Sequence, residues 1–198
     1  MDIAFQPIIL MVTGEVIAYE ILCRPEEGIA NYFKTSTPKE LWKKEKICLE
    51  AALKAIKMID APVHINITAT SIPFFLMYDY RWKGAIEIVE WGFPLPDGFG
   101  ALIRSLRRRG FDVWIDDLSP LIWPVFSSYS GITGYKISLS DLEYAKRIID
   151  SDAPVIIEKI ETEEDAVRAQ KIGAIYGQGY LYGRPKLIGG EIKSESTS

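Results

Sequence analysis

Apolar residues along the chain follow two patterns that predict different elements. Short continuous runs rich in Val, Ile and aromatic residues are typical of buried β-strands. The expected strands are 3–11, 16–22, 63–67, 85–89, 112–116, 135–137, 154–157 and 174–176. Between several of them, apolar residues recur near helical spacing, with Ser140 as an expected N-cap. The expected helices are 38–59, 97–109, 140–149 and 162–172, whereas 26–37 is polar and irregular.

Strands that mostly alternate with helices predict an α/β fold, a modified TIM (β/α)8 barrel. Only a short turn at Thr13-Gly14 separates the first two strands, so we expect them to pair antiparallel as a hairpin. An open doubly wound sheet is the alternative architecture. One barrel domain is expected over 1–188, followed by a disordered polar tail over 189–198.

Composition narrows the class of protein. The chain has 198 residues, of which 48% are hydrophobic and 25% charged, as in an ordinary globular domain. Its net charge of −4 argues against DNA or RNA as the main partner. No apolar run approaches the roughly 20 residues needed to span a membrane. The two cysteines, Cys23 and Cys48, are too few for a disulfide scaffold, and they favour a cytoplasmic location.

Polar side chains recur where the expected strands end. They are Glu20, Asn66, Glu90, Asp116, Asp117, Lys136, Glu158 and Gln178. In a barrel, the carboxyl ends of parallel strands meet at one face, so these side chains should converge. Several carboxylates in one place repel each other unless cations neutralise them, and oxygen ligands suit Mg²⁺ or Mn²⁺. The pattern therefore predicts a metal-assisted site for a phosphorylated substrate.

With their flanking residues, these positions resemble the EAL domain, a bacterial phosphodiesterase that hydrolyses cyclic di-GMP. Phe5-Gln6-Pro7-Ile8 resembles the family's YQPI motif, and Glu20-Ile21-Leu22-Cys23-Arg24 resembles its ExLxR signature. The remaining matches in chain order are the asparagine ligand at Asn66, the ITE glutamate at Glu90, the DD pair at Asp116-Asp117, the KID lysine at Lys136, AEGVET at 157–162, QGY at 178–180 and the closing proline at Pro185.

The resemblance implies a two-metal site for Mg²⁺ or Mn²⁺ and hydrolysis of cyclic di-GMP to linear pGpG. The implied ligands are Glu20, Asn66, Glu90 and Asp116 for one cation, and Asp116 or Asp117 with Glu158 for the other. The implied catalytic residues are Lys136, Glu158 and Gln178. The implied substrate-binding residues are Gln6, Leu22, Arg24 and Glu161. Lys136 would orient the attacking water or its phosphate, and Glu158 could act as a base.

Several positions depart from the family's pattern. The loop that usually reads DDFGTG is Asp116-Asp117-Leu118-Ser119-Pro120, and Pro120 cannot adopt the conformations of a glycine. Lys159 replaces the glycine of AEGVET, and Ser138 replaces the aspartate of KID. The glutamate expected after the ITE motif is replaced near Phe93. These changes alter the support of the expected ligands.

Two hypotheses follow. The first is a metal-dependent phosphodiesterase, slowed by the altered loop. The second is a module that binds cyclic di-GMP, or a regulatory protein partner, without turnover. A barrel acting on another phosphate ester is a more distant alternative. A homodimer is compatible with either hypothesis.

Two inward-facing positions have structural interpretations. His64 lies two residues before Asn66, and we expect a hydrogen-bonded core histidine rather than a catalytic one. Trp114 lies two residues before Asp116 and should also face the barrel interior. Gly134 is expected to leave the space that this large side chain needs.

Overall fold

The computed structural model describes residues 1–35, 37–89 and 95–188. Its strands form one sheet in the order β2-β3-β4-β5-β6-β7-β8-β1-β9, and the additional pairing of β1 with β2 closes eight of them into a barrel. The strands are β1 (Asp2–Leu10), β2 (Glu15–Arg24), β3 (Val63–Thr68), β4 (Gly84–Val89), β5 (Asp112–Ile115), β6 (Gly134–Ser138), β7 (Val155–Glu158), β8 (Tyr176–Gly177) and β9 (Lys186–Leu187). The expected barrel is confirmed, and the open sheet is wrong.

The first strand runs against its neighbours. It pairs antiparallel with β2 from Asp2↔Arg24 to Leu10↔Glu15, and antiparallel with β8 on its other side. From β2 round to β8, each strand pairs parallel with the next. The expected antiparallel hairpin is therefore confirmed, and the carboxyl ends of β2 to β8 meet at one end of the barrel.

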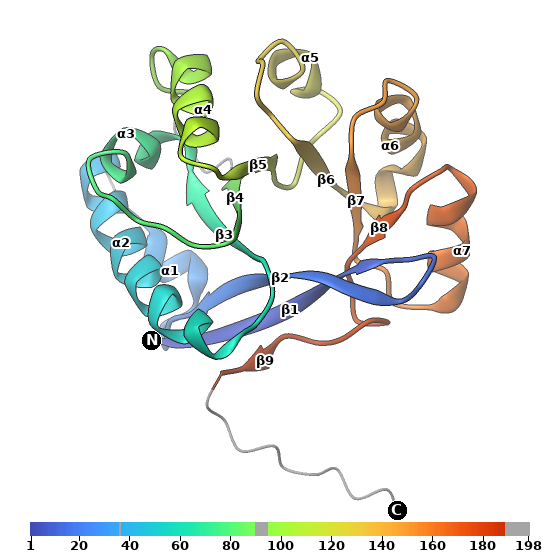
Figure 1. Cartoon of the computed structure of the whole chain (residues 1–198), viewed down its shortest axis with the longest axis horizontal. Helices are drawn as coiled ribbons and strands as arrows, with labels where there is room; N and C mark the ends of the chain where they lie inside the picture. The colour runs from blue at the N-terminus through green and yellow to red at the C-terminus, as the bar shows by residue number, and fades with distance from the viewer. Residues whose placement is uncertain (36, 90–94, 189–198) are drawn as a thin grey trace, which may run out of the picture.

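Helices lie around the outside of this ring of strands (Figure 1). They are α1 (Ile29–Phe33), α2 (Pro38–Ala55), α3 (Ile72–Phe75), α4 (Phe99–Arg108), α5 (Trp123–Phe126), α6 (Leu142–Ile149) and α7 (Glu163–Lys171). Three short 3₁₀ turns cover Ile56–Met58, Ala69–Ser71 and Leu139–Asp141. Over the described ranges, no helix is long and apolar enough to cross a membrane.

Local chemistry explains two of the helix starts. Pro38 begins α2 behind Thr37, whose hydroxyl accepts a hydrogen bond from the backbone N–H of Glu40. Thr162 and Asp165 form a capping box at the start of α7. Both starts agree with the sequence pattern, because the residues that signal them act within one helical turn.

Two local expectations were wrong. Ser140 does not cap α6: it lies inside the 3₁₀ turn, where its own N–H is bound by the hydroxyl of Ser138. Residues 29–33 form α1 within the segment expected to be irregular. The Tyr32 hydroxyl of this short helix bonds the carbonyl oxygen of Lys44 in α2, a tertiary contact that no local pattern signals. The tail at 189–198 lies outside the described residues.

The core has an outer and an inner part. The larger apolar cluster lies where the helices cover the strands, and includes Ile103, Leu106 and Ile148, which are fully buried. A smaller, separate cluster consists of Ile8, Ala18, Ala85, Trp114 and Ile156. These side chains alternate along their strands with those of the outer cluster, so they fill the barrel interior below the polar residues. The expected inward orientation of Trp114 is confirmed.

Candidate functional site

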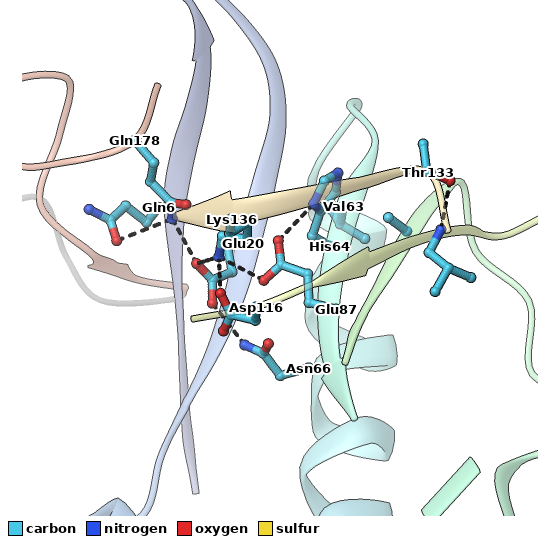
Figure 2. A network of polar contacts seen from close by, with 12 residues as sticks. Gln6, Glu20, Val63, His64, Asn66, Glu87, Asp116, Thr133, Lys136 and Gln178 are labelled. Atoms are coloured by element: carbon cyan, nitrogen blue, oxygen red, sulfur yellow. Dashed lines mark hydrogen bonds and ion pairs between the residues drawn. The ribbon is translucent and has the colours of Figure 1, made fainter. Parts of the chain in front are cut away.

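A buried lysine lies at the centre of the polar residues. Lys136 projects from β6 and is fully buried. Its Nζ lies within 3.2 Å of one carboxylate oxygen from each of four strands or strand ends. Figure 2 shows three of these acids, Glu20, Glu87 and Asp116, around the lysine. The distances are 3.0 Å to Glu20, 2.9 Å to Glu87, 3.2 Å to Asp116 and 3.1 Å to Glu158. A buried ammonium is stable only with such compensation.

Burial and the shared lysine set the ionisation of this cluster. Burial opposes the charge of Lys136, but the four carboxylates outweigh it and raise its pKa well above the ordinary value. Burial raises the pKa of Glu87 to about 8, and the pKa values of Asp116 and Glu158 to about 7. Burial would raise the pKa of Glu20 as well, but Lys136 and two amide hydrogen bonds bring it below its ordinary value. Near pH 7 the cluster therefore combines an ionised Glu20 with groups that exchange protons readily.

Two side-chain amides fix the carboxylate of Glu20. Asn66 Nδ2 donates to Glu20 Oε1 over 2.8 Å, and Gln178 Nε2 donates to Glu20 Oε2 over 2.7 Å. Gln178 also lies 3.4 Å from Gln6 Oε1, and Gln6 in turn donates to the carbonyl oxygen of Gly183. The side-chain N–H groups of both amides thus donate hydrogen bonds, and their oxygens remain for other partners.

Three oxygen atoms in this cluster are buried and lack hydrogen bonds to any described residue. They belong to Asn66 (Oδ1), Asp116 (Oδ1) and Gln178 (Oε1). Asp116 Oδ1 lies 3.2 Å from Lys136 Nζ, but outside hydrogen-bond geometry. Buried polar atoms normally have a hydrogen-bond partner, so an oxygen without one can accept a cation as its partner. One carboxylate oxygen each from Glu20, Glu87 and Asp116 lie within 4.8 Å of one another, as ligands of one cation would.

A pocket opens beside these acids. It measures about 200 Å³, and Glu20, Asn66 and Asp116 contribute to its wall. Leu22 and Arg24, at the end of β2, line it too, together with apolar residues of α1 and α2. The pocket thus combines charged and apolar lining residues, a mixture that suits a ligand with both a phosphate and an aromatic base. A larger hollow of about 700 Å³ lies near Met1 and Leu187, and the described residues that line it include no comparable set of buried acids.

Three comparisons with known proteins bear on this barrel. No family model matches the sequence. The cyclic di-GMP phosphodiesterase CdgJ of Vibrio cholerae is 29% identical over 116 residues, which are 54% of this chain and 26% of CdgJ. Among solved structures, the EAL domain of Mycobacterium smegmatis DcpA superposes with a TM-score of 0.69 at 20% identity, covering 93% of this chain and 92% of that domain. This chain has the EAL-domain fold.

Two further EAL structures agree. BlrP1 of Klebsiella pneumoniae, in a complex with calcium and cyclic di-GMP, gives a TM-score of 0.75 at 20% identity, over 95% of this chain and 56% of BlrP1. A standalone EAL protein from Vibrio cholerae O395, bound to cyclic di-GMP, gives 0.72 at 16% identity, over 92% and 91% of the two chains. The chain thus spans about a quarter of the curated relative and just over half of BlrP1.

The EAL-fold barrel brings most of the expected site residues together. The residues that meet around Lys136 are Glu20, Asn66, Asp116, Glu158 and Gln178, with Gln6 one contact further out. Asp117 lies at the rim with 74% of its side chain exposed, and Glu161 is exposed. Glu90, expected as a metal ligand, lies outside the described residues, as does Phe93.

The sequence interpretation missed Glu87. This residue is fully buried in the middle of β4 and bonds both Lys136 and His64, whose Nδ1 lies 2.8 Å from Glu87 Oε1. The signal was a single acid inside the otherwise apolar strand 85–89, two residues after the inward-facing Ala85. Burial, helped by the ammonium of Lys136, lowers the pKa of His64 to about 4, so this histidine is neutral. The expected core histidine is thereby confirmed.

The altered loop after Asp117 is held by its first residue. Leu118 is buried, and its N–H bonds the carbonyl oxygen of Lys136. Asp117 adopts a left-handed backbone, with φ of 45°. The loop therefore packs against β6 through Leu118, while the second acid of the pair turns to solvent.

Proposed function

We propose that the protein is a divalent-cation-dependent phosphodiesterase that hydrolyses cyclic di-GMP to linear pGpG. The observation that carries the proposal is the buried Oδ1 of Asn66, which has no hydrogen bond to a described residue, next to the ionised Glu20 and to Asp116. It lies at the carboxyl ends of the strands in an EAL-fold barrel, and relatives of this fold are described as bound to, or acting on, cyclic di-GMP.

The donor set fits a hard cation. Carboxylate and amide oxygens are the ligands that Mg²⁺ and Mn²⁺ prefer. Glu20, Asn66 and Asp116 would hold the ion, with Glu90 completing the set as the sequence resemblance implies. A bound cation of this kind lowers the pKa of its water and stabilises charge on a phosphoryl oxygen.

The chain's own residues then position the reaction. Lys136 holds the acids in place and supplies a fixed positive charge beneath the scissile phosphate. Glu158, with its pKa raised to about 7, can accept a proton from the attacking water near neutral pH. Gln178 orients Glu20 through its amide N–H. The water oxygen attacks the phosphorus of one phosphodiester, and the bond between that phosphorus and the 3′ oxygen breaks. The 3′ oxygen takes up a proton, and the ring opens.

The substrate-binding residues lie around this centre. Arg24 borders the pocket and would hold the phosphate that is not cleaved, by a charge-assisted hydrogen bond. Leu22 offers an apolar contact to a base. Gln6, Asp117 and Glu161 complete the proposed contacts, with Asp117 and Glu161 at the exposed rim.

A second candidate is a receptor that binds cyclic di-GMP without hydrolysing it. It is favoured by Asp117, whose side chain is 74% exposed and paired with Lys159, in a loop that departs from the family's sequence. A receptor of this kind would act through a regulatory protein partner or a homodimer in the cytoplasm.

One experiment separates the candidates. Purified protein is incubated with cyclic di-GMP and Mg²⁺ or Mn²⁺, and pGpG is followed by chromatography. Glu20→Ala and EDTA should both abolish product, whereas Glu15→Gln, an exposed change on the same strand, should not. Metal-dependent pGpG supports the enzyme. Saturable binding by calorimetry without product supports the receptor. The absence of both product and binding would overturn both candidates.

A further inference from the structure

Two residues at the mouth of the barrel adopt a backbone that their side chains disfavour. Lys159 comes directly after the last residue of β7, and its φ is 62°. Asp117 lies two residues after the last residue of β5, and its φ is 45°. Elsewhere in the described chain, only Asp152 among non-glycine residues has a positive φ. Asp adopts the left-handed region more readily, whereas in Lys the Cβ comes too close to the following carbonyl oxygen. Strained backbones of this kind concentrate at functional sites.

The two strained residues face each other. Lys159 Nζ lies 3.8 Å from Asp117 Oδ1, although the two residues are 42 positions apart, and both side chains reach the solvent. An exposed pair at this distance contributes little to stability. The feature of interest is therefore where the ammonium lies: at the carboxyl ends of β5 and β7, against Asp117, on the residue that directly follows Glu158.

Charges at the mouth divide into two sides. On the side of β5 to β7, Glu158 is paired with Lys136 and Asp117 with Lys159. On the side of β2 and β3, Lys136 also contacts Glu20 over 3.0 Å, but the buried Oδ1 of Asn66 has no hydrogen bond to a described residue. Lys136 thus serves both sides, whereas Lys159 is an additional ammonium on the β5–β7 side, and the oxygen without a described partner lies on the β2–β3 side.

We propose that Lys159 supplies the fixed cation on the β5–β7 side, so that the protein binds one divalent cation rather than two. The inference deepens the proposed function and rests on it, because it concerns how the same mouth neutralises a phosphodiester.

Manganese stoichiometry tests this directly. Mn²⁺ binding is measured by titration calorimetry, and by electron paramagnetic resonance of free Mn²⁺, on the wild type and on Lys159→Met, Lys159→Gly and Lys171→Met. Lys159→Met removes only the charge, Lys159→Gly removes charge and strain, and Lys171→Met is a control on an exposed helical lysine. We expect one Mn²⁺ per chain in the wild type and control, and two in both Lys159 variants.

The other outcomes are equally decisive. Two Mn²⁺ ions in the wild type, or one in every variant, would overturn the inference and leave the proposed function standing. A wild type without bound Mn²⁺ would count against the proposed function. It would overturn the inference as well, because the inference requires one bound ion in the wild type.

Discussion

The indole ring of Trp114 occupies the space that a side chain at residue 134 would need. A Cβ built on Gly134 would lie 2.6 Å from Cζ3 of Trp114 and 2.6 Å from the carbonyl oxygen of Pro154. The two residues are partners in the parallel pairing of β5 with β6. The barrel interior therefore accepts a tryptophan only because its neighbour has no side chain.

Replacing Gly134 with Ala should overpack this interior. We expect Gly134→Ala to lower the free energy of unfolding by about 1–3 kcal/mol, measured by chemical denaturation. Trp114→Leu in the same chain should relieve the contact with the ring but not the contact with Pro154. The double variant should then be more stable than the sum of the single changes by at least about 0.5 kcal/mol. Strict additivity would show that the two side chains do not compete for space.

This pair shows what the sequence could predict about the fold. Period-two alternation placed Trp114 on the same face as Asp116, and the short turn before β2 required an antiparallel hairpin. Both depend on near neighbours in the chain. The helix at 29–33 and the 3₁₀ turn around Ser140 could not be predicted, because contacts with distant segments or a neighbouring hydroxyl decide them.

The site was predictable to a similar degree. Parallel strands bring their carboxyl ends together, so Glu20, Asn66 and Lys136 could be expected to converge. The role of Glu87 could not, because its partners come from β3 and β6. Tertiary packing alone decides which amide oxygen lacks a hydrogen bond. It also decides which lysine has a left-handed backbone.

Asn66 tests the proposed cation site. Asn66→Leu removes the buried oxygen and keeps a side chain of similar size. We expect Mn²⁺ affinity, measured by calorimetry, to fall at least about tenfold. Asn31→Leu, on the exposed helix α1, should leave the affinity unchanged. Equal affinities in the two variants would show that the amide of Asn66 is not a ligand.

Lys136 should matter most at high pH. In Lys136→Met the carboxylates around Nζ lose their shared cation, so we expect a loss of about 3–5 kcal/mol in the free energy of unfolding at pH 8. At pH 5 these groups can be protonated in the folded protein, and the loss should be smaller. Lys146→Met, which breaks a surface pair with Asp150, should change stability little at either pH. A loss independent of pH would contradict the assigned electrostatics.

Glu45 should make stability fall as pH rises. Burial raises the pKa of Glu45 to about 7, despite hydrogen bonds from Ser71 and Thr68. A carboxyl whose pKa is raised in the folded state stabilises it below the unfolded pKa of 4.5, and this contribution disappears as pH rises through about 7. Glu45→Gln keeps an acceptor for the N–H of Thr68 and cannot ionise.

The stability of the variant relative to that of the wild type should therefore rise between pH 4.5 and pH 8. We expect Glu45→Gln to gain about 3 kcal/mol in the free energy of unfolding, relative to the wild type, between these two pH values. Denaturation curves at both values measure the difference. Parallel pH profiles would mean that Glu45 ionises as readily in the folded chain as in the unfolded one.

The strain at Lys159 has a stability signature that is separate from its charge. Glycine adopts φ near 60° without the clash of a Cβ, so Lys159→Gly should raise the free energy of unfolding by about 1 kcal/mol. Lys159→Ala loses the charge but keeps the Cβ, and it should show no such gain. Lys171→Gly, in the last turn of α7, should instead lose about 1 kcal/mol, because glycine weakens a helix. If Lys159→Gly and Lys159→Ala unfold at the same denaturant concentration, the left-handed backbone carries no cost. The presence of a lysine at this position would then need no functional reason.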